Sequence, residues 1–332
     1  MTDVLFLRSD ELSNLATPAE YVDVVRSGYE SHGRDGSAAP RTKLVRAEPP
    51  GMCTGYLAVL PELGVMGGYT YAAGFGDADA HFALPLFDAD SGRMLALLDG
   101  ASMNPFKTGA AGAVGVDELA REDATTCAVI GSGAQARGQL KATATVREFE
   151  TVRVYSPTPE NRETFADEFD ERLDAEVRAA ESSADAVADA DVVITATQAE
   201  EPVVAYEALA DGAHVTAMGQ YDRGRRELDV ETIANSTYVP DLRERAFQDA
   251  GAFLAALDAG AVDEDHVHAE LGEVVAGTKP GRTREDELTV FDSGGTGIET
   301  VAAAGMLYEK AREQGLGEEL AFAPASEALT GE

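Results

Sequence analysis

The sequence lacks tryptophan and has only two cysteines, Cys53 and Cys127. Both cysteines lie in apolar surroundings without the spacing of metal ligands, so we expect two reduced, buried thiols. No apolar run approaches the roughly 20 residues that a membrane-spanning helix needs. The N-terminus lacks the basic start and long apolar core of a signal peptide. These absences argue against a membrane protein, and we expect a cytoplasmic one.

Positive charge is also scarce. The 332 residues include 60 acidic side chains against 26 lysines and arginines, a formal net charge of −34. Nucleic acid and anionic membranes would repel such a chain, because a phosphate backbone requires clustered cations. The acids are spread along the chain, which is typical of surfaces that stay hydrated at high salt. This pattern favours a halophilic origin, and the alternative is an ordinary acidic protein.

The chain is long enough for two domains with separate cores. From residue 124 onward, short apolar segments such as CAVI, VRVYS and VVITAT alternate with helical ones. This alternation predicts an α/β fold with a Rossmann-type, doubly wound parallel sheet, which we place at residues 122–292. Earlier segments predict an amphipathic helix, strands and a hairpin turn at Asp88–Gly92. The last helix is expected to return to them, so residues 1–121 and 293–332 form a second, α+β domain.

A glycine-rich turn, GSGAQA, directly follows the apolar segment CAVI and opens a helix. Gly131, Gly133 and Ala136 occupy the three small positions of the dinucleotide-binding pattern. The first makes the tight turn, the second lets the backbone approach a pyrophosphate, and the third lets the helix pack on the strand. The positive end of the helix dipole would face the pyrophosphate. The turn therefore predicts a dinucleotide-binding site.

The next strand ends in VYSPTPENR, where dinucleotide-binding folds usually place an acid. Such an acid accepts bonds from the ribose 2′-hydroxyl and repels a 2′-phosphate. Ser156 removes the repulsion, Ser156 and Thr158 can donate hydrogen bonds, and Arg162 can add positive charge. This favours NADP(H) over NAD(H). The alternatives are that Glu160 bends back to the ribose, or that the protein accepts both cofactors.

Several motifs, in order and spacing, resemble the ornithine cyclodeaminase/μ-crystallin family. They are TGAAGAVGVDELAREDA, CAVIGSGAQARGQLKA, GAHVTAMGQYDRGRREL and AELGEVVAGTKPGRTREDELTVFDSGGTGIETVAAA. The resemblance covers nearly the whole chain and points to ornithine cyclodeaminases, archaeal alanine dehydrogenases and imine reductases. It implies a homodimer whose subunits each pair a Rossmann domain with a substrate and dimerisation domain built from both chain ends.

The resemblance also implies roles for individual residues. Arg41 matches the arginine that grips the substrate carboxylate, and Thr108 matches a threonine that contacts the cofactor. The residue before that threonine is an arginine in the family and Lys107 in this chain. The other residues implied at the pyrophosphate, ribose and nicotinamide are Ala134, Gln135, Thr197, Gly219, Arg225 and Ser293.

Two departures from the family pattern bear on the chemistry. A lysine expected in the segment MGGYTYAAG is absent, and Gly67 and Gly68 stand at its position. Where cyclodeaminases and alanine dehydrogenases have an aspartate, this chain has Tyr221, with Asp222 one residue later. Because ornithine cyclisation relies on that lysine and aspartate, these departures weigh against a cyclodeaminase.

Reduction of a small α-imino or α-keto acid remains within reach of the other residues. Hydride transfer needs orientation and charge near the reacting group, and Arg41 with Lys107 can hold an α-carboxylate. An acid must also protonate the imine or the new amine. The candidates are Tyr221 and Asp222, followed by Tyr69, Tyr71 and His81, and a purely structural role is the alternative for each.

We therefore expect an NADP(H)-dependent oxidoreductase of the imine reductase or alanine dehydrogenase type. The alternatives are an ornithine cyclodeaminase, and a non-catalytic NADP-binding protein that kept the fold and lost the chemistry. The acidic segment around His266 and His268 lacks recurring ligand spacing, so we expect no metal. The expected partners are a small amino or imino acid and a second copy of the chain, with no nucleic acid and no membrane.

Overall fold

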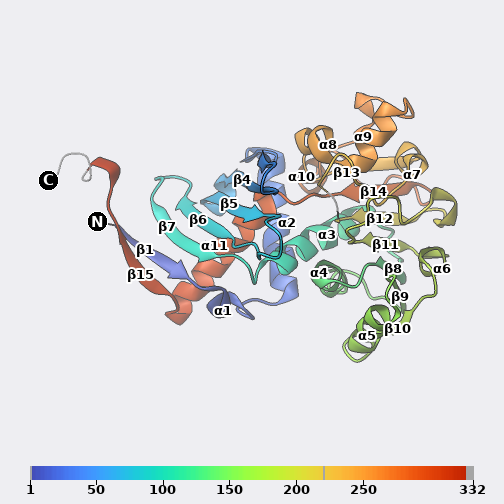
Figure 1. Cartoon of the computed structure of the whole chain (residues 1–332), viewed down its shortest axis with the longest axis horizontal. Coiled ribbons are helices and arrows are strands. Elements are labelled where there is room, and N and C mark those ends of the chain that lie inside the picture. Colours follow the sequence, from blue (N-terminus) through green and yellow to red (C-terminus); the bar gives the residue numbers. More distant parts are fainter. Residues whose placement is uncertain (1, 220, 327–332) are drawn as a thin grey trace.

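The computed structural model describes residues 2–219 and 221–326, which form two sheets flanked by helices (Figure 1). The first sheet has eight strands in the order β15-β1-β7-β6-β5-β4-β2, with β3 paired to β4. Apart from the parallel pair β1 and β7, its neighbours run antiparallel. Its strands are β1 Thr2–Leu7, β2 Ser37–Ala38, β3 Thr42–Arg46, β4 Gly51–Leu60, β5 Val65–Ala73, β6 Ala83–Asp88, β7 Met94–Asp99 and β15 Glu318–Phe322.

The second sheet has seven strands in the order β10-β9-β8-β11-β12-β14-β13. All of its neighbours pair in parallel, so the predicted Rossmann-type parallel sheet is confirmed. Its strands are β8 Thr126–Ile130, β9 Thr151–Tyr155, β10 Glu176–Ala179, β11 Val192–Thr195, β12 His214–Ala217, β13 Ser236–Pro240 and β14 Leu288–Asp292.

Two long helices, α2 and α11, pack on the first sheet and on each other. A Thr17–Glu20 capping box opens α2 with Pro18 at its first position, as the Thr-Pro start predicts. The α-helices are α1 Ser9–Leu12, α2 Pro18–Arg34, α3 Asn104–Leu119, α4 Ala134–Thr143, α5 Pro159–Asp170, α6 Ser183–Val187, α7 Val230–Ala234, α8 Arg243–Asp249, α9 Gly251–Asp258, α10 Leu271–Val275 and α11 Gly297–Gln314. Short 3₁₀ helices cover Pro61–Leu63, Tyr206–Ala208 and Glu264–His266.

Helix α3 joins the two halves of the molecule (Figure 1). It packs along α4 at backbone distance: a Cβ on Gly109 would lie 2.3 Å from the carbonyl oxygen of Gly138. The small residues that fill α3 therefore serve a close helix–helix contact. The strands of the parallel sheet lie between residues 126 and 292, in line with the proposed extent of the nucleotide-binding domain at 122–292.

The prediction of two buried thiols is half wrong. Cys127 in β8 is buried, but Cys53 is exposed. Cys53 lies on β4 opposite Leu44 of β3, and both side chains point away from the core on the alternating pattern of the strand. An apolar neighbourhood in sequence does not imply burial when part of the outer face of a strand pair is itself apolar.

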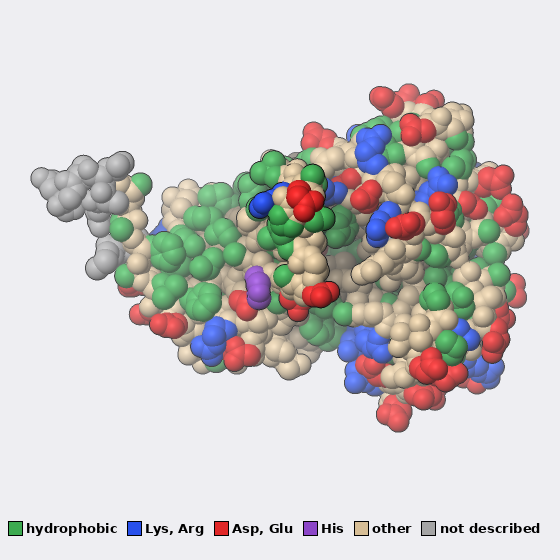
Figure 2. Space-filling view, viewed as in Figure 1, with side chains coloured by type: hydrophobic (Ala, Val, Ile, Leu, Met, Phe, Trp, Pro, Cys, Tyr) green, Lys and Arg blue, Asp and Glu red, His purple; other side chains and the backbone are tan. Residues whose placement is uncertain are grey.

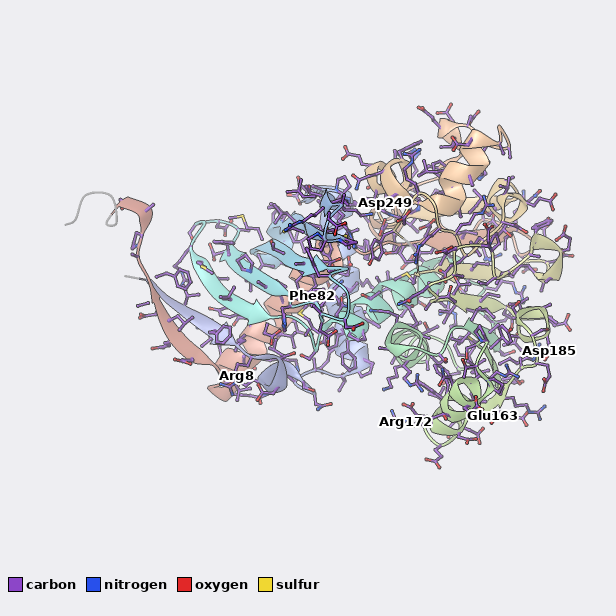
Figure 3. All side chains as sticks on the ribbon, in the orientation of Figure 1. Arg8, Phe82, Glu163, Arg172, Asp185 and Asp249 are labelled. Carbon is purple, nitrogen blue, oxygen red and sulfur yellow. The ribbon has the colours of Figure 1, made fainter. Side chains whose placement is uncertain are left out.

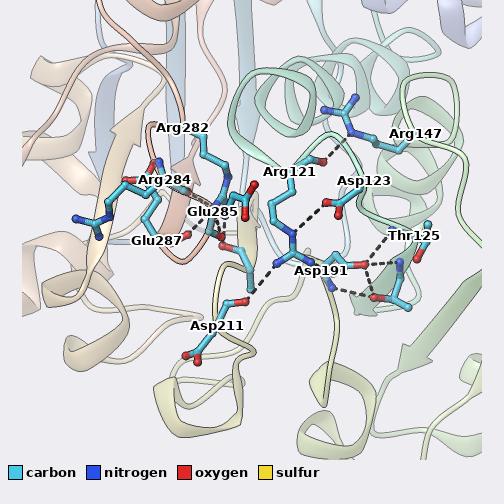
Figure 4. A network of polar contacts seen from close by, with 12 residues as sticks. Arg121, Asp123, Thr125, Arg147, Asp191, Asp211, Arg282, Arg284, Glu285 and Glu287 are labelled. Carbon is cyan, nitrogen blue, oxygen red and sulfur yellow. Dashed lines mark hydrogen bonds and ion pairs between the residues drawn. The ribbon is translucent and has the colours of Figure 1, made fainter.

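A polar network ties α3 to the amino ends of the parallel strands (Figure 4). Arg121, just after α3, pairs with Asp191, which precedes β11. Asp191 Oδ2 accepts the backbone N–H groups of Thr125 and Thr126 at 2.9 Å each. This network lies at the amino ends of the parallel strands, on the side of the sheet away from their carboxyl ends.

Within the described ranges, no helix is long and apolar enough to span a membrane. The same residues contain no group of three or more histidine, cysteine or acidic side chains that could hold a metal ion.

Candidate cofactor and substrate site

The carboxyl ends of the parallel strands carry the predicted cofactor residues. The strand order reverses between β8 and β11, the point at which open parallel sheets bind nucleotides. Gly131 follows β8 with a φ of 122°, and a Cβ there would lie 2.4 Å from the Ala196 carbonyl oxygen. Only glycine fits this turn. A Cβ on Gly133 would meet no described atom within 4 Å, so packing alone does not explain the second glycine.

Helix α4 follows the turn and begins at Ala134. Ala136 is fully buried in the contact between helix and sheet, the role predicted for the third small residue. Gln135 Oε1 is buried and lacks a hydrogen-bond partner in the part of the chain that the structure describes. The Thr108 carbonyl oxygen accepts from Gln139 Nε2 at 2.8 Å, which places Thr108 one turn along α4 from the glycine turn.

Two serines and an arginine meet at the end of β9. Ser132 Oγ donates to Ser156 Oγ at 3.0 Å, which joins the glycine turn to this strand. Arg162 Nη1 donates to the Ser156 carbonyl oxygen at 3.0 Å, and Thr158 is the N-cap residue of α5. Glu160, the alternative ribose ligand, is exposed in the first turn of α5. The residues predicted to select NADP(H), Ser156, Thr158 and Arg162, thus lie together between the end of β9 and the start of α5.

The loop that follows β14, Ser293–Gly295, is fixed by hydrogen bonds to a buried acid, which is itself paired with a buried arginine. Ser293 Oγ and the Gly294 N–H donate to Asp241 Oδ2 at 2.7 and 3.0 Å. The buried Arg245 binds Asp241 Oδ1 at 2.8 Å and Asp292 Oδ1 at 2.9 Å. Sequence reasoning predicted Ser293 but missed the network that positions it, because its members lie up to 53 residues apart.

Thr197 and Gly219 share a partner that sequence reasoning also missed. The carboxylate of Glu227, 3% exposed, accepts the N–H of Thr197 at 2.6 Å and that of Gly219 at 2.8 Å. Its only sequence signal was an acid in the segment GRREL, which looks like any surface acid in so acidic a chain. Arg225 points elsewhere, to the exposed Glu200 at 3.3 Å.

Arg41 lies where the first sheet meets the loop after β14. Its Nη1 donates to the Tyr71 hydroxyl at 2.8 Å and its Nη2 to the Gly294 carbonyl oxygen at 2.6 Å. The guanidinium also lies 5.0 Å from the ring centre of Tyr56 and 4.2 Å from that of Tyr221. Arg41 is only 5% exposed, and no carboxylate among the described residues pairs with it. Its charge is therefore held in place without being neutralised.

Lys107 is fully buried and already paired. Its Nζ lies 3.2 Å from Glu299 Oε1 and 5.7 Å from the Tyr56 ring centre. Burial alone would lower the pKa of Lys107, but Tyr56 and Glu299 outweigh it and raise that pKa, so the amine stays protonated. Glu299 also accepts the Thr296 N–H at 2.7 Å in the capping box of α11. That T-x-x-E spacing was the one sequence signal for this missed residue.

Tyr221 is the predicted proton donor that the structure places beside Arg41. Its ring is 38% exposed and faces the guanidinium. Lys43 Nζ lies 5.1 Å from the same ring and 2.9 Å from Asp249 Oδ2. This pair links β3 to α8 across the site, where Asp249 points toward the first sheet (Figure 3).

The other proton-donor candidates lie in less suitable surroundings. The Asp222 carboxylate accepts the Gly224 N–H at 2.8 Å within its own exposed turn. The Tyr69 hydroxyl donates to the Gly100 carbonyl oxygen, and burial raises the pKa of Tyr69. Burial likewise raises the pKa of Tyr71, whose oxygen accepts from Arg41. His81 is exposed in the loop before β6.

The profile of the ornithine cyclodeaminase/μ-crystallin family matches residues 76–315. The chain belongs to this family. The match confirms the resemblance carried by the glycine turn and the segments around it.

Relatives of the chain act on imino and amino acids, as their names state. Δ1-pyrroline-2-carboxylate reductase of Bacillus cereus is 35% identical over 238 residues, 71% of this chain and 73% of that protein. The Thermococcus litoralis enzyme of the same name, solved with NADH and L-proline, is 33% identical with a TM-score of 0.89, over 96% and 100% of the two chains. An archaeal alanine dehydrogenase dimer with bound NAD is 28% identical with a TM-score of 0.89, over 97% and 100%.

Proposed function

We propose that this family member is an NADP(H)-dependent oxidoreductase that reduces a small α-imino acid, or an α-keto acid together with ammonia. The activities named for its relatives support this reaction class. The observation that carries the proposal is Arg41, a buried guanidinium without a carboxylate partner among the described residues, beside the cofactor-binding edge. Such a group is suited to the α-carboxylate that these substrates share.

The chain's own groups divide the remaining work. When bound, the nicotinamide supplies or accepts the hydride. Arg41 orients the substrate by its carboxylate, and the surrounding rings lower the local dielectric and so strengthen this bond. Lys107 adds a second positive charge behind Tyr56, and Glu299 holds it there. We assign delivery of the proton to Tyr221, with Asp222 as the alternative.

NADP(H) is the cofactor that we propose, with NAD(H) as the alternative. Ser156 replaces the acid that would repel a 2′-phosphate, and the anchored Arg162 lies beside it. The nicotinamide cofactor itself is supported by the related structures, which hold NADH and NAD. The preference for the phosphorylated form therefore rests on residues of this chain alone.

Turnover decides between the candidate functions. NADPH oxidation is followed in molar KCl with Δ1-pyrroline-2-carboxylate, Δ1-piperideine-2-carboxylate, or pyruvate plus ammonia. We expect oxidation with at least one of them. Ammonia release from L-ornithine would instead favour a cyclodeaminase. Binding of NADPH without turnover of any substrate would indicate a non-catalytic binding protein.

We also propose that the protein is a homodimer. The outer face of β3 and β4 exposes three large apolar side chains next to Cys53, and exposed apolar patches mark interaction sites. They are Leu44, Leu57 and Val59, between 39% and 69% exposed. The related alanine dehydrogenase is a dimer, which supports a second copy of this chain as a partner, and we propose this face as the contact.

High salt is the environment that we propose for this protein. Acidic side chains are scattered over the visible surface, most densely around the parallel-sheet half (Figure 2). Such a distribution fits a halophilic origin. The two free thiols fit a cytoplasmic location, which we retain as a proposal.

A further inference from the structure

Glu227 is a buried acid that no step of the proposed reaction uses. It lies between β12 and α7 and is 3% exposed. Its carboxylate accepts hydrogen bonds from Thr195 Oγ at 3.0 Å, the Thr197 N–H at 2.6 Å and the Gly219 N–H at 2.8 Å, and the Thr197 side chain also bonds to it. No cation pairs with it in residues 2–219 and 221–326. Burying a carboxyl group in this way is costly, and the structure gives it donors in place of a counter-charge.

These donors come from the segments at the carboxyl ends of two neighbouring strands. Thr195 ends β11 and Thr197 follows it, whereas Gly219 lies two residues beyond β12. One carboxylate therefore ties together the segments that leave both strands. The residue at 219 matches this arrangement: a Cβ there would lie 2.5 Å from both oxygens and the carbon of the carboxyl group. Gly219 is small because Glu227 occupies the space.

These two segments border the cofactor-binding edge. The Ala196 carbonyl oxygen abuts the glycine turn at Gly131, and the Ser293 N–H donates to the Ala217 carbonyl oxygen at 3.0 Å. The segments thus lie between the pyrophosphate turn and the loop after β14. With the adenosine end at β9, a dinucleotide extended across the reversal point would carry its nicotinamide half over them.

We propose that Glu227 is a positioning residue, which fixes the segments after β11 and β12 so that they receive the nicotinamide half of the cofactor. This inference rests on the proposed function. It predicts that loss of the carboxylate weakens contacts to the nicotinamide half and leaves the adenosine half untouched.

The decisive variant is Glu227→Gln. The amide keeps the volume, but whichever way it turns, its NH₂ group faces the N–H of either Thr197 or Gly219. One backbone donor then loses its acceptor. We expect NADPH to bind at least about tenfold more weakly, as for a lost hydrogen bond to a charged group, while affinity for 2′,5′-ADP is unchanged. Both affinities are measured by calorimetric titration in molar KCl.

Glu287 provides a matched control. It is also buried, at 7% exposure, and it too accepts backbone N–H groups, from Thr283 and Arg284, and hydroxyls, from Thr237 and Thr283. It precedes β14 at the opposite edge of the same sheet. Glu287→Gln should lower the melting temperature without changing the ratio of NADPH to 2′,5′-ADP affinity.

A second variant covers the case in which Glu227→Gln does not fold. Thr195→Val removes one donor to the carboxylate and keeps its shape. It should change the affinity ratio in the same direction by a smaller factor. The inference is overturned if NADPH and 2′,5′-ADP weaken together, or if neither changes. A wild-type protein that binds neither NADPH nor NADH would instead remove the proposed function on which the inference rests.

Discussion

At the scale of single residues, the two buried cations of the candidate site differ in their partners. Arg41 pairs with no acid among the described residues, whereas Lys107 pairs with Glu299. Arg41 is held by a hydroxyl and a carbonyl oxygen, groups that orient a guanidinium without cancelling its charge. Lys107 forms an ion pair with Glu299, so an acid of the protein itself largely neutralises its charge. Substitutions at the two positions should therefore differ in kind. Loss of Arg41 should impair substrate binding, whereas loss of Lys107 should first impair stability.

Arg41→Ala should lower kcat/KM for an α-imino acid by roughly 10- to 150-fold, the range for losing a charge-assisted hydrogen bond. NADPH affinity should stay nearly unchanged. Arg46→Ala is the control, because the Arg46 guanidinium donates to the nearby Glu48 carbonyl oxygen and pairs with no acid among the described residues. Steady-state kinetics and fluorescence titration measure both quantities. Full activity of Arg41→Ala would place the carboxylate grip elsewhere.

Lys107→Met should destabilise the protein by about 3 to 5 kcal/mol, because it leaves the Glu299 carboxylate buried without its cation. The double substitution Lys107→Met, Glu299→Leu should recover much of that loss. Denaturant unfolding of the three proteins provides the free energies. A single variant as stable as the wild type would show that Lys107 is available to the substrate and not committed to Glu299.

At the scale of elements, we propose that the connection between β9 and α5 selects the cofactor. Ser156→Asp places a carboxylate beside the ribose site, where it repels a 2′-phosphate and can accept from a 2′-hydroxyl. We expect the preference for NADPH to reverse in favour of NADH, by about tenfold or more in the ratio of affinities. Fluorescence titration of both cofactors measures it. Asn235→Asp adds the same charge before β13, at the opposite edge of the sheet, and should leave the ratio unchanged.

Elements whose signals are local were predictable from sequence. The parallel strands appear as short apolar runs, and the turn at Gly131 requires a φ that only glycine adopts readily. The capping box that opens α2 is likewise contained within four residues. In each case the determinant and the structure that it produces lie in one short segment.

Partners that are distant in sequence were not predictable. Glu299 meets Lys107 across 192 residues, and Glu227 meets Thr197 across 30. Both acids look like surface residues in a chain with 60 of them. What distinguishes these two acids from the others is that they are buried and hold other residues in place. Burial is a property of the folded chain and cannot be identified from a short segment of sequence. Cys53 is the opposite case: its apolar neighbours in sequence suggested burial, but the folded chain exposes it.

At the scale of the whole molecule, charge and shape act together. Acidic side chains are scattered over the face seen in Figure 2, whereas the outer face of β3 and β4 exposes Leu44, Leu57 and Val59. The proposed dimer must bring together two subunits that each carry a formal net charge of −34. Mutual repulsion opposes both folding and association. Counter-ions have to screen that repulsion before the apolar face can hold two copies together.

Stability and dimerisation should therefore both depend on salt. The screening length grows from about 3 Å at 1 M to about 10 Å at 0.1 M, which lets neighbouring carboxylates repel one another over longer distances. We expect the melting temperature to fall by several degrees, and the dimer to dissociate, as KCl is lowered over this range. Thermal melts and light scattering measure the two effects. Sucrose in place of KCl is the control, since it favours burial without screening charge and should not restore the dimer. A melting temperature that stays flat down to 0.1 M KCl would show an acidic protein with no adaptation to salt.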